Sequence, residues 1–183
     1  GTHIILSFIA SLLLVILGMP SLIRLAIQKN LLDEPSEDRK VHTRSVPRLG
    51  GVLIFIGTMV TTSIFVQPTG EEAVAFLRMG AAATILFFLG LKDDLYVLDP
   101  LKKLAVQIVV GGTLILGGGF MIDDFSGLFG LSTISMGVAI PFSLFVYIVV
   151  VNAVNLIDGV DTLAGGYGFL VAISCALWFH LTG

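Results

Sequence analysis

Four polar side chains recur at every third position directly after an apolar run: Asn152, Asn155, Asp158 and Asp161. Asparagine can both donate hydrogen bonds to and accept them from sugars and phosphates, whereas aspartate oxygens suit Mg²⁺. Each step of three residues turns an ideal helix by about 300°, so one straight helix would not bring all four together. Gly159 therefore predicts a break or tightening of the helix that lets several of them reach one pocket. Helix-end capping with interfacial polarity is the simpler alternative.

Two adjacent carboxylates, Asp93 and Asp94, follow a second apolar run that ends at Leu91. Carboxylates at a membrane boundary cost little compared with carboxylates at its midplane. Neighbouring residues on a helix point about 100° apart, so the two cannot form one symmetric clamp. One could bind a metal ion while the other orients a phosphate. A solvated helix end balanced by Lys92 is the alternative.

A basic segment comprises residues 39–51, with Arg39, Lys40, His42 and Arg48 as its candidate binding residues. Arginine binds phosphate oxygens in pairs and lysine acts as a point charge, so the segment could hold a diphosphate or a lipid phosphate. Pro47 and the Gly50-Gly51 pair indicate a fixed loop shape. The alternative is that these charges only keep the loop on the cytoplasmic side.

The elements that must carry these residues are membrane helices. Of the 183 residues, 56% are hydrophobic and 13% are charged, and the mean hydropathy is +1.01. The charged fraction is about half the ~25% typical of soluble domains, which excludes an ordinary soluble domain. A membrane helix needs about 20 apolar residues. Six stretches meet or nearly meet this length: Ile4–Ile27, Leu49–Val66, Ala73–Leu91, Leu104–Ile122, Gly137–Val154 and Leu163–Leu181. The predicted fold is a single all-α, polytopic transmembrane domain over residues 1–183.

The distribution of lysine and arginine predicts the orientation of the chain. Nine of the ten lie in or beside the first and third loops, and the tenth, Arg78, lies near the other end of the third span. Because cytoplasmic loops retain positive charge, the N-terminus is predicted outside, with the three motif-bearing loops cytoplasmic. The net charge of −3 argues against a nucleic-acid partner. The glycines at 111, 112 and 117–119 are expected to be helix-packing positions rather than a phosphate loop.

Taken together, these motifs resemble those of the polyprenyl-phosphate N-acetylhexosamine-1-phosphate transferase family, membrane enzymes that begin bacterial cell-surface glycans on a lipid carrier. The resemblance rests on three motifs in order: Arg39-Lys40-Val-His42 with Pro47-Arg48-Leu-Gly50-Gly51, Asp93-Asp94 with Lys103, and Asn152-x-x-Asn155-x-x-Asp158-Gly-x-Asp161. The first is more similar to the branch that uses UDP-N-acetylglucosamine or a related UDP-N-acetylhexosamine. Thr162 stands where the family usually has glycine. Family members are also longer, so the chain is expected to be the N-terminal part of a larger enzyme.

The resemblance implies a reaction in which undecaprenyl phosphate attacks the sugar-proximal phosphate of a UDP-sugar and releases UMP. It implies catalytic roles for Asp93, Asp94, Asp158 and Asp161, and Mg²⁺ or Mn²⁺ binding by Asp94, Asp158 and Asp161. The implied substrate-binding residues are Arg39, Lys40, His42, Arg48, Lys103, Asn152 and Asn155. The implied location is the plasma (inner) membrane, with the active site on the cytoplasmic face.

The residues alone leave two other functional classes of protein open. One is a transporter that uses boundary carboxylates, although no predicted span carries an acidic residue near its middle, where transport sites usually lie. The other is a noncatalytic membrane scaffold. In each case the apolar faces of the helices must meet lipid, further spans or a second copy in a homo-oligomer.

Overall fold

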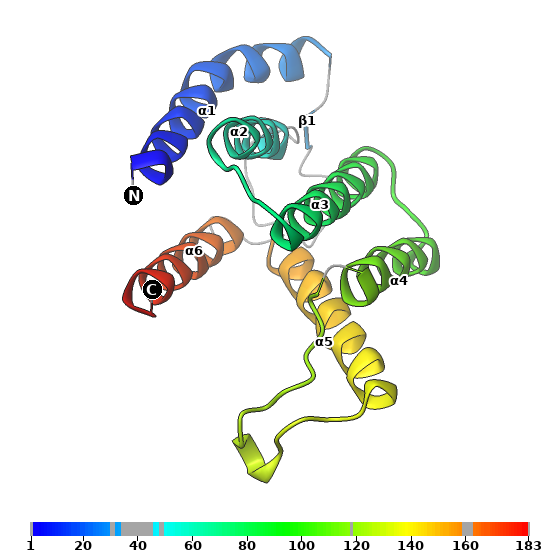
Figure 1. Cartoon of the computed structure of the whole chain (residues 1–183). Coiled ribbons are helices and arrows are strands. Elements are labelled where there is room, and N and C mark those ends of the chain that lie inside the picture. The colour runs from blue at the N-terminus through cyan, green and yellow to red at the C-terminus, as the bar shows by residue number, and fades with distance from the viewer. Residues whose placement is uncertain are drawn as a thin grey trace.

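The computed structural model describes residues 2–29, 32–33, 46–47, 50–117, 119–158 and 163–182. The regular secondary structure of the described part is helical, apart from a short antiparallel pair in which Leu32 of β1 lies opposite Pro47 of β2, and an isolated bridge between Asp124 and Thr133. The elements, in chain order, are α1 (Thr2–Gln28), β1 (Leu32–Asp33), β2 (Val46–Pro47), α2 (Gly50–Phe65), α3 (Glu71–Leu95), α4 (Pro100–Gly117), η1 (Leu128–Gly130), α5 (Met136–Ile157) and α6 (Leu163–Thr182). Figure 1 shows α1 beside α2, α4 beside both α3 and α5, and α6 standing apart.

Five of the described helices are long and apolar enough to cross a membrane: α1, α3, α4, α5 and α6. α2 is equally apolar but has only 16 residues, or about 24 Å at 1.5 Å per residue, against a hydrocarbon core of about 30 Å. The all-helical architecture is confirmed, and the five candidate spans are consistent with a polytopic membrane protein, whereas a sixth span stays a prediction. Within the described chain no residue of α6 is buried, so its apolar surface faces outward.

The helix boundaries depart from the predicted spans where polar residues continue a helix. α3 runs on to Leu95, so Asp93 and Asp94 lie on its last turn instead of following it. α4 begins at Pro100, four residues before the predicted start, and ends at Gly117, five before the predicted end. Gly119 then adopts a left-handed φ of 74°, which glycine adopts without steric cost.

Close packing of α1 with α2 depends on small residues. A Cβ added at Gly18 would lie 2.9 Å from a methyl group of Leu53, and one added at Gly57 would lie 3.1 Å from the Ser11 hydroxyl. Membrane helices associate through such close approach, because lipid tails are as apolar as leucine. α2 also meets α3 through Phe55 and Phe87, whose rings stack with centroids 4.1 Å apart. Pro20 lies inside α1 and removes a helical hydrogen bond, and α1 is visibly curved in Figure 1.

The seam between α4 and α5 also contains a glycine. Gly111 is buried, and a Cβ placed there would come within 2.6 Å of the Tyr147 ring and 2.9 Å of Leu144. The expected packing role is therefore confirmed for Gly111, whereas an added Cβ at Gly112 would meet nothing within 4 Å. The two helices lie close enough for polar side chains further along the same seam to meet.

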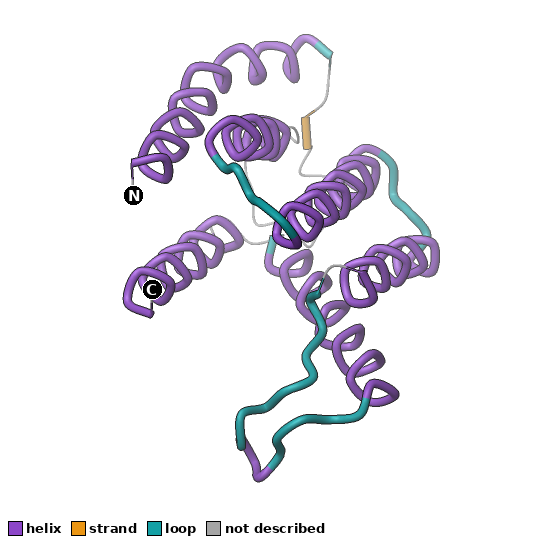
Figure 2. The backbone as a smooth tube through the Cα atoms, in the orientation of Figure 1, coloured by secondary structure: helices purple, strands orange, loops and turns teal. Residues whose placement is uncertain are grey.

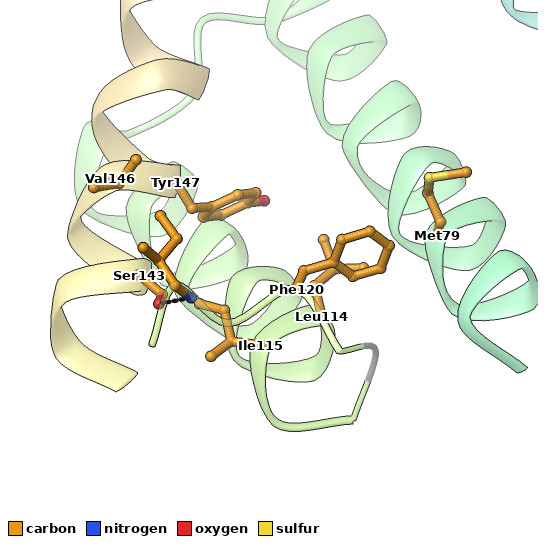
Figure 3. Close-up of a pocket in the computed structure, with 8 residues that line it drawn as sticks. Met79, Leu114, Ile115, Phe120, Ser143, Val146 and Tyr147 are labelled. Carbon is orange, nitrogen blue, oxygen red and sulfur yellow. Dashed lines mark hydrogen bonds between the residues drawn. The ribbon is translucent and has the colours of Figure 1, made fainter. Parts of the chain in front are cut away.

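The long connection between α4 and α5, drawn in teal in Figure 2, returns onto the first turns of α5. The Ile122 N–H donates to Ser143 Oγ at 2.8 Å, and the Phe125 and Phe142 rings lie 5.6 Å apart. An apolar pocket of about 320 Å³ lies above this contact (Figure 3), and Phe120 and Tyr147 project into the space toward Met79 of α3. The Tyr147 hydroxyl is buried there without a hydrogen-bond partner among the described residues.

Candidate active site

The start of α4 is fixed by its own sequence. Asp99 Oδ1 accepts hydrogen bonds from the backbone N–H groups of Leu101 at 2.9 Å and Lys102 at 3.2 Å. This is the arrangement of an N-cap, and Pro100 occupies the first helical position, where its missing N–H costs nothing. The cap sets the direction of the first turn. Lys103 and Gln107, one turn apart, consequently lie on the same side of α4.

An ion pair joins α3 to α4. Lys103 Nζ lies 2.6 Å from Asp93 Oδ2, and the other carboxylate oxygen of Asp93 accepts from the Leu98 N–H at 3.2 Å. The side chains of Lys103 and Asp93 are only 16% and 25% exposed. A pair shielded to this degree interacts more strongly than a solvated surface pair. Asp93 therefore holds both the connection between the two helices and the ammonium group of Lys103.

The same ammonium group reaches the third motif. Lys103 Nζ donates to Asn155 Oδ1 at 3.1 Å, which joins residues 52 positions apart in the sequence. We call Asp93, Lys103 and Asn155 the Lys103 cluster. Lys103 contacts one residue from each of two predicted motifs. The fold therefore brings both motifs together where α3 and α5 end and α4 begins.

One turn deeper, two amides pair across the same seam. Asn152 Nδ2 donates to Gln107 Oε1 at 2.8 Å, and Gln107 Nε2 returns a longer contact of 3.5 Å to Asn152 Oδ1. Gln107 is 1% exposed, so the pair satisfies amide groups that are costly to bury alone. Sequence reasoning missed Gln107. The signal was present, because it is a lone polar residue in the apolar run after Lys103 and stands four positions from it.

A pocket of about 310 Å³ lies beside the Lys103 cluster, between α3, α4 and α5. Its wall combines aliphatic side chains with the polar groups already described. The lining residues are Leu86, Leu89, Gly90, Lys103, Gln107, Val151, Val154, Asn155 and Asp158. Asp158 follows the last residue of α5 and is exposed, with its N–H bonded to the Val154 carbonyl at 3.2 Å. The pocket thus presents one cation, one carboxylate and two amides beside an apolar wall.

Asn152 and Asn155 lie within continuous α5, which ends at Ile157, whereas the break predicted at Gly159 lies outside the described residues. Successive steps of three on α5 diverge by only about 60°, and the long side chains of Lys103 and Gln107 span that divergence. Asp158 lies at the helix end and still lines the same pocket.

The other predicted site residues fall into two groups. Asp94 is exposed, next to Asp93 on α3, and does not line the pocket. Five lie outside the described residues: Arg39, Lys40, His42, Arg48 and Asp161. Among the described residues no group of three or more His, Cys, Asp or Glu side chains is placed to hold a metal ion. Metal binding by Asp94, Asp158 and Asp161 therefore stays a prediction.

Comparison with known proteins identifies the family of this sequence. The model of glycosyl transferase family 4 matches residues 76–183, which include α4, α5, α6 and all of the Lys103 cluster. The chain belongs to this family. The resemblance inferred from the three motifs is thereby confirmed.

Individual relatives agree with the family match. The chain is 37% identical over 184 residues to a probable undecaprenyl-phosphate N-acetylglucosaminyl 1-phosphate transferase of Bacillus subtilis, covering 99% of this chain and 49% of the relative. It is 31% identical to a decaprenyl-phosphate N-acetylglucosaminephosphotransferase of Mycobacterium tuberculosis, covering 77% of this chain and 37% of the relative. It is 30% identical to the undecaprenyl-phosphate alpha-N-acetylglucosaminyl 1-phosphate transferase of Escherichia coli K12, covering 85% of this chain and 42% of the relative. The chain thus spans about half, or less, of the length of these relatives. No solved structure matches it significantly.

Proposed function

We propose that the protein transfers N-acetylglucosamine 1-phosphate from a UDP-sugar to a polyprenyl phosphate. An oxygen of the lipid phosphate attacks the sugar-proximal phosphorus, the bond from that phosphorus to the bridging oxygen breaks, and UMP leaves with that oxygen. The observation that carries the proposal is the Lys103 cluster, which joins the aspartate motif of α3 to the asparagine motif of α5 beside one pocket. The names of the relatives supply the substrate class.

The chemistry needed is mainly the assembly of anions. A phosphate monoester with a second pKa of about 6 is largely ionised at neutral pH, so the lipid needs no strong base. Lys103 supplies positive charge to the phosphates, and Asp93 positions that ammonium group before substrate arrives. Asn155 and Asp158 bind the nucleotide sugar from the end of α5. Positioning and electrostatic stabilisation of this kind dominate phosphoryl transfer in general.

A divalent cation belongs to the proposal. Asp94, Asp158 and Asp161 offer the oxygen ligands that Mg²⁺ prefers, and Mn²⁺ accepts the same donors. When bound, the ion would neutralise diphosphate charge and stabilise departing UMP. Arg39, Lys40, His42 and Arg48 would add substrate-binding groups from the first loop, and Asn152 would support Asn155 through its pairing with Gln107.

The decisive experiment is a transfer assay on membranes that contain the intact protein. We expect UMP release from UDP-N-acetylglucosamine that requires both polyprenyl phosphate and Mg²⁺, with formation of a sugar diphospholipid. Omission of the lipid controls for simple hydrolysis. A transporter or a noncatalytic scaffold would release no UMP, and that result would overturn the proposal.

The proposed topology has six spans, an outside N-terminus and the Lys103 cluster at the cytoplasmic face of the plasma membrane. It rests on the distribution of lysine and arginine between alternate loops. It also agrees with the position of the cluster at one end of α3, α4 and α5.

Single cysteines test the orientation. With exposed Cys175 replaced by alanine, cysteines at positions 36 and 97 should resist an impermeant thiol reagent applied to intact cells, and one at position 69 should react. Val97 is 100% exposed, and its replacement leaves the Asp99 cap of α4 intact. Labelling after lysis controls for accessibility. Reaction at position 36 or 97 in intact cells would reverse the orientation.

A further inference from the structure

A charged side chain lies far from the candidate active site, within apolar α3. Arg78 precedes Asp93 by 15 residues, or about 22 Å of helix, and lies about two turns from the start of α3 at Glu71. A charge at this depth is expensive in hydrocarbon unless its long side chain reaches toward the interface or meets a polar partner. The position of the guanidinium group therefore indicates the role of Arg78.

The guanidinium group lies against the end of α4. A Cβ added at Gly117, the last residue of that helix, would come within 3.1 Å of both Cζ and Nη1 of Arg78. The free carbonyl groups at a helix C-terminus attract a cation to this place. Among the described residues, however, no hydrogen bond or ion pair engages Arg78. Its five N–H donors thus have bonding capacity to spare.

Two pockets meet at Arg78 and Gly117. The first, of about 450 Å³, is lined at the start of α3 by the carboxylates Glu71 and Glu72 as well as Arg78. The second, of about 510 Å³, is an open groove along α4. Its remaining lining residues are Ile108, Val109, Gly112, Thr113 and Leu116. A charged pocket therefore continues into a mainly apolar groove, with the guanidinium group between them.

We propose that these two pockets bind a phospholipid whose headgroup carries a phosphate and a primary ammonium group. The phosphate oxygens accept hydrogen bonds from Arg78, the ammonium group donates to Glu71 and Glu72, and one acyl chain lies in the groove along α4. Two carboxylates and one guanidinium group give the first pocket a net charge of −1. A headgroup with net negative charge would meet repulsion there, whereas a zwitterion of this kind satisfies charges of both signs.

Photocrosslinking in nanodiscs tests the proposal. The purified protein is placed in phosphatidylcholine nanodiscs with a trace of photoreactive phosphatidylethanolamine, and unlabelled phosphatidylethanolamine or phosphatidylglycerol is added as competitor. Phosphatidylethanolamine should compete about tenfold better, and Arg78→Gln should lower the crosslinking yield about tenfold, as expected for losing hydrogen bonds to a charged group. Lys92→Gln removes the same charge at the other end of α3 and should leave the yield unchanged. An unchanged yield in Arg78→Gln would overturn the proposal.

Two further variants separate the headgroup contacts. Glu71→Gln combined with Glu72→Gln should abolish the preference for phosphatidylethanolamine over phosphatidylcholine while Arg78 still binds phosphate. Gly117→Ala should weaken crosslinking by displacing the guanidinium group, whereas Gly80→Ala, where a Cβ meets nothing within 4 Å, should not. Inorganic phosphate should not compete. If it competes as well as the lipid, the site binds free phosphate and the lipid assignment is wrong.

Discussion

Lys103→Met should lower the rate of sugar-phosphate transfer by a factor of about 10²–10³, the usual cost of removing one preorganised charge-stabilising group. The change removes the cation of the pocket and leaves the Asp93 carboxylate without the ammonium group that lies 2.6 Å from it. The measurement is UMP release by membranes matched for inserted protein. Lys103→Arg should recover part of the rate, because it keeps the charge with a different hydrogen-bonding geometry.

The neighbouring lysine provides a matched control. Lys102 is exposed and does not line the pocket, so Lys102→Met should retain nearly full activity. The double variant Asp93→Asn with Lys103→Met should lose less activity than the two single losses combined, because the residues act as a pair. Equal rates for the Lys102 and Lys103 variants would show that the cluster is not part of the active site.

The second large effect concerns the carboxylates. Replacing Asp93, Asp94, Asp158 or Asp161 with asparagine should reduce turnover by orders of magnitude while the protein still inserts and folds. Asparagine preserves size and much of the hydrogen bonding but removes the charge to which we assign Mg²⁺ binding and, at Asp93, the orientation of the Lys103 ammonium group. UMP release at saturating Mg²⁺, with monodispersity in detergent as the folding check, measures the effect.

Asp99→Asn is the control for charge removal in the same region. Asparagine caps helices as well as aspartate does, so α4 should still begin at Pro100. The activity of the protein should therefore be unchanged. Near-normal turnover in two or more of the four site variants would contradict the proposed active site. Loss of activity in Asp99→Asn would show that removing any carboxylate charge at this surface lowers turnover, so that the losses in the four site variants would not identify the active site.

Much of the fold was predictable because membrane helices are specified by long apolar runs. The predicted span Leu163–Leu181 and the observed α6 differ by only one residue. The predicted helix boundaries are wrong where local capping and continued helical hydrogen bonding, and not hydropathy, set the end of a helix. α3 continues through Asp93 and Asp94, and α4 begins at Pro100 because Asp99 caps it, although the first turn of α4 contains two lysines.

The candidate site was predictable as residue types but not as contacts. The three-residue spacing and the paired aspartates identified Asp93, Asn155 and Asp158, yet no pattern in the sequence pairs Lys103 with a residue 52 positions away. That contact depends on the antiparallel seam of α4 and α5, whose closeness rests on the fit of Gly111 against Tyr147. Gln107 was missed for the same reason, because its role exists only through Asn152.

The amide pair of Gln107 and Asn152 has a mechanical consequence. A slip of α5 along α4 by one turn, about 5.4 Å, would break the amide pair and the contact of Lys103 with Asn155 together. The amide pair and the contact of Lys103 with Asn155 together therefore fix the register of α4 against α5.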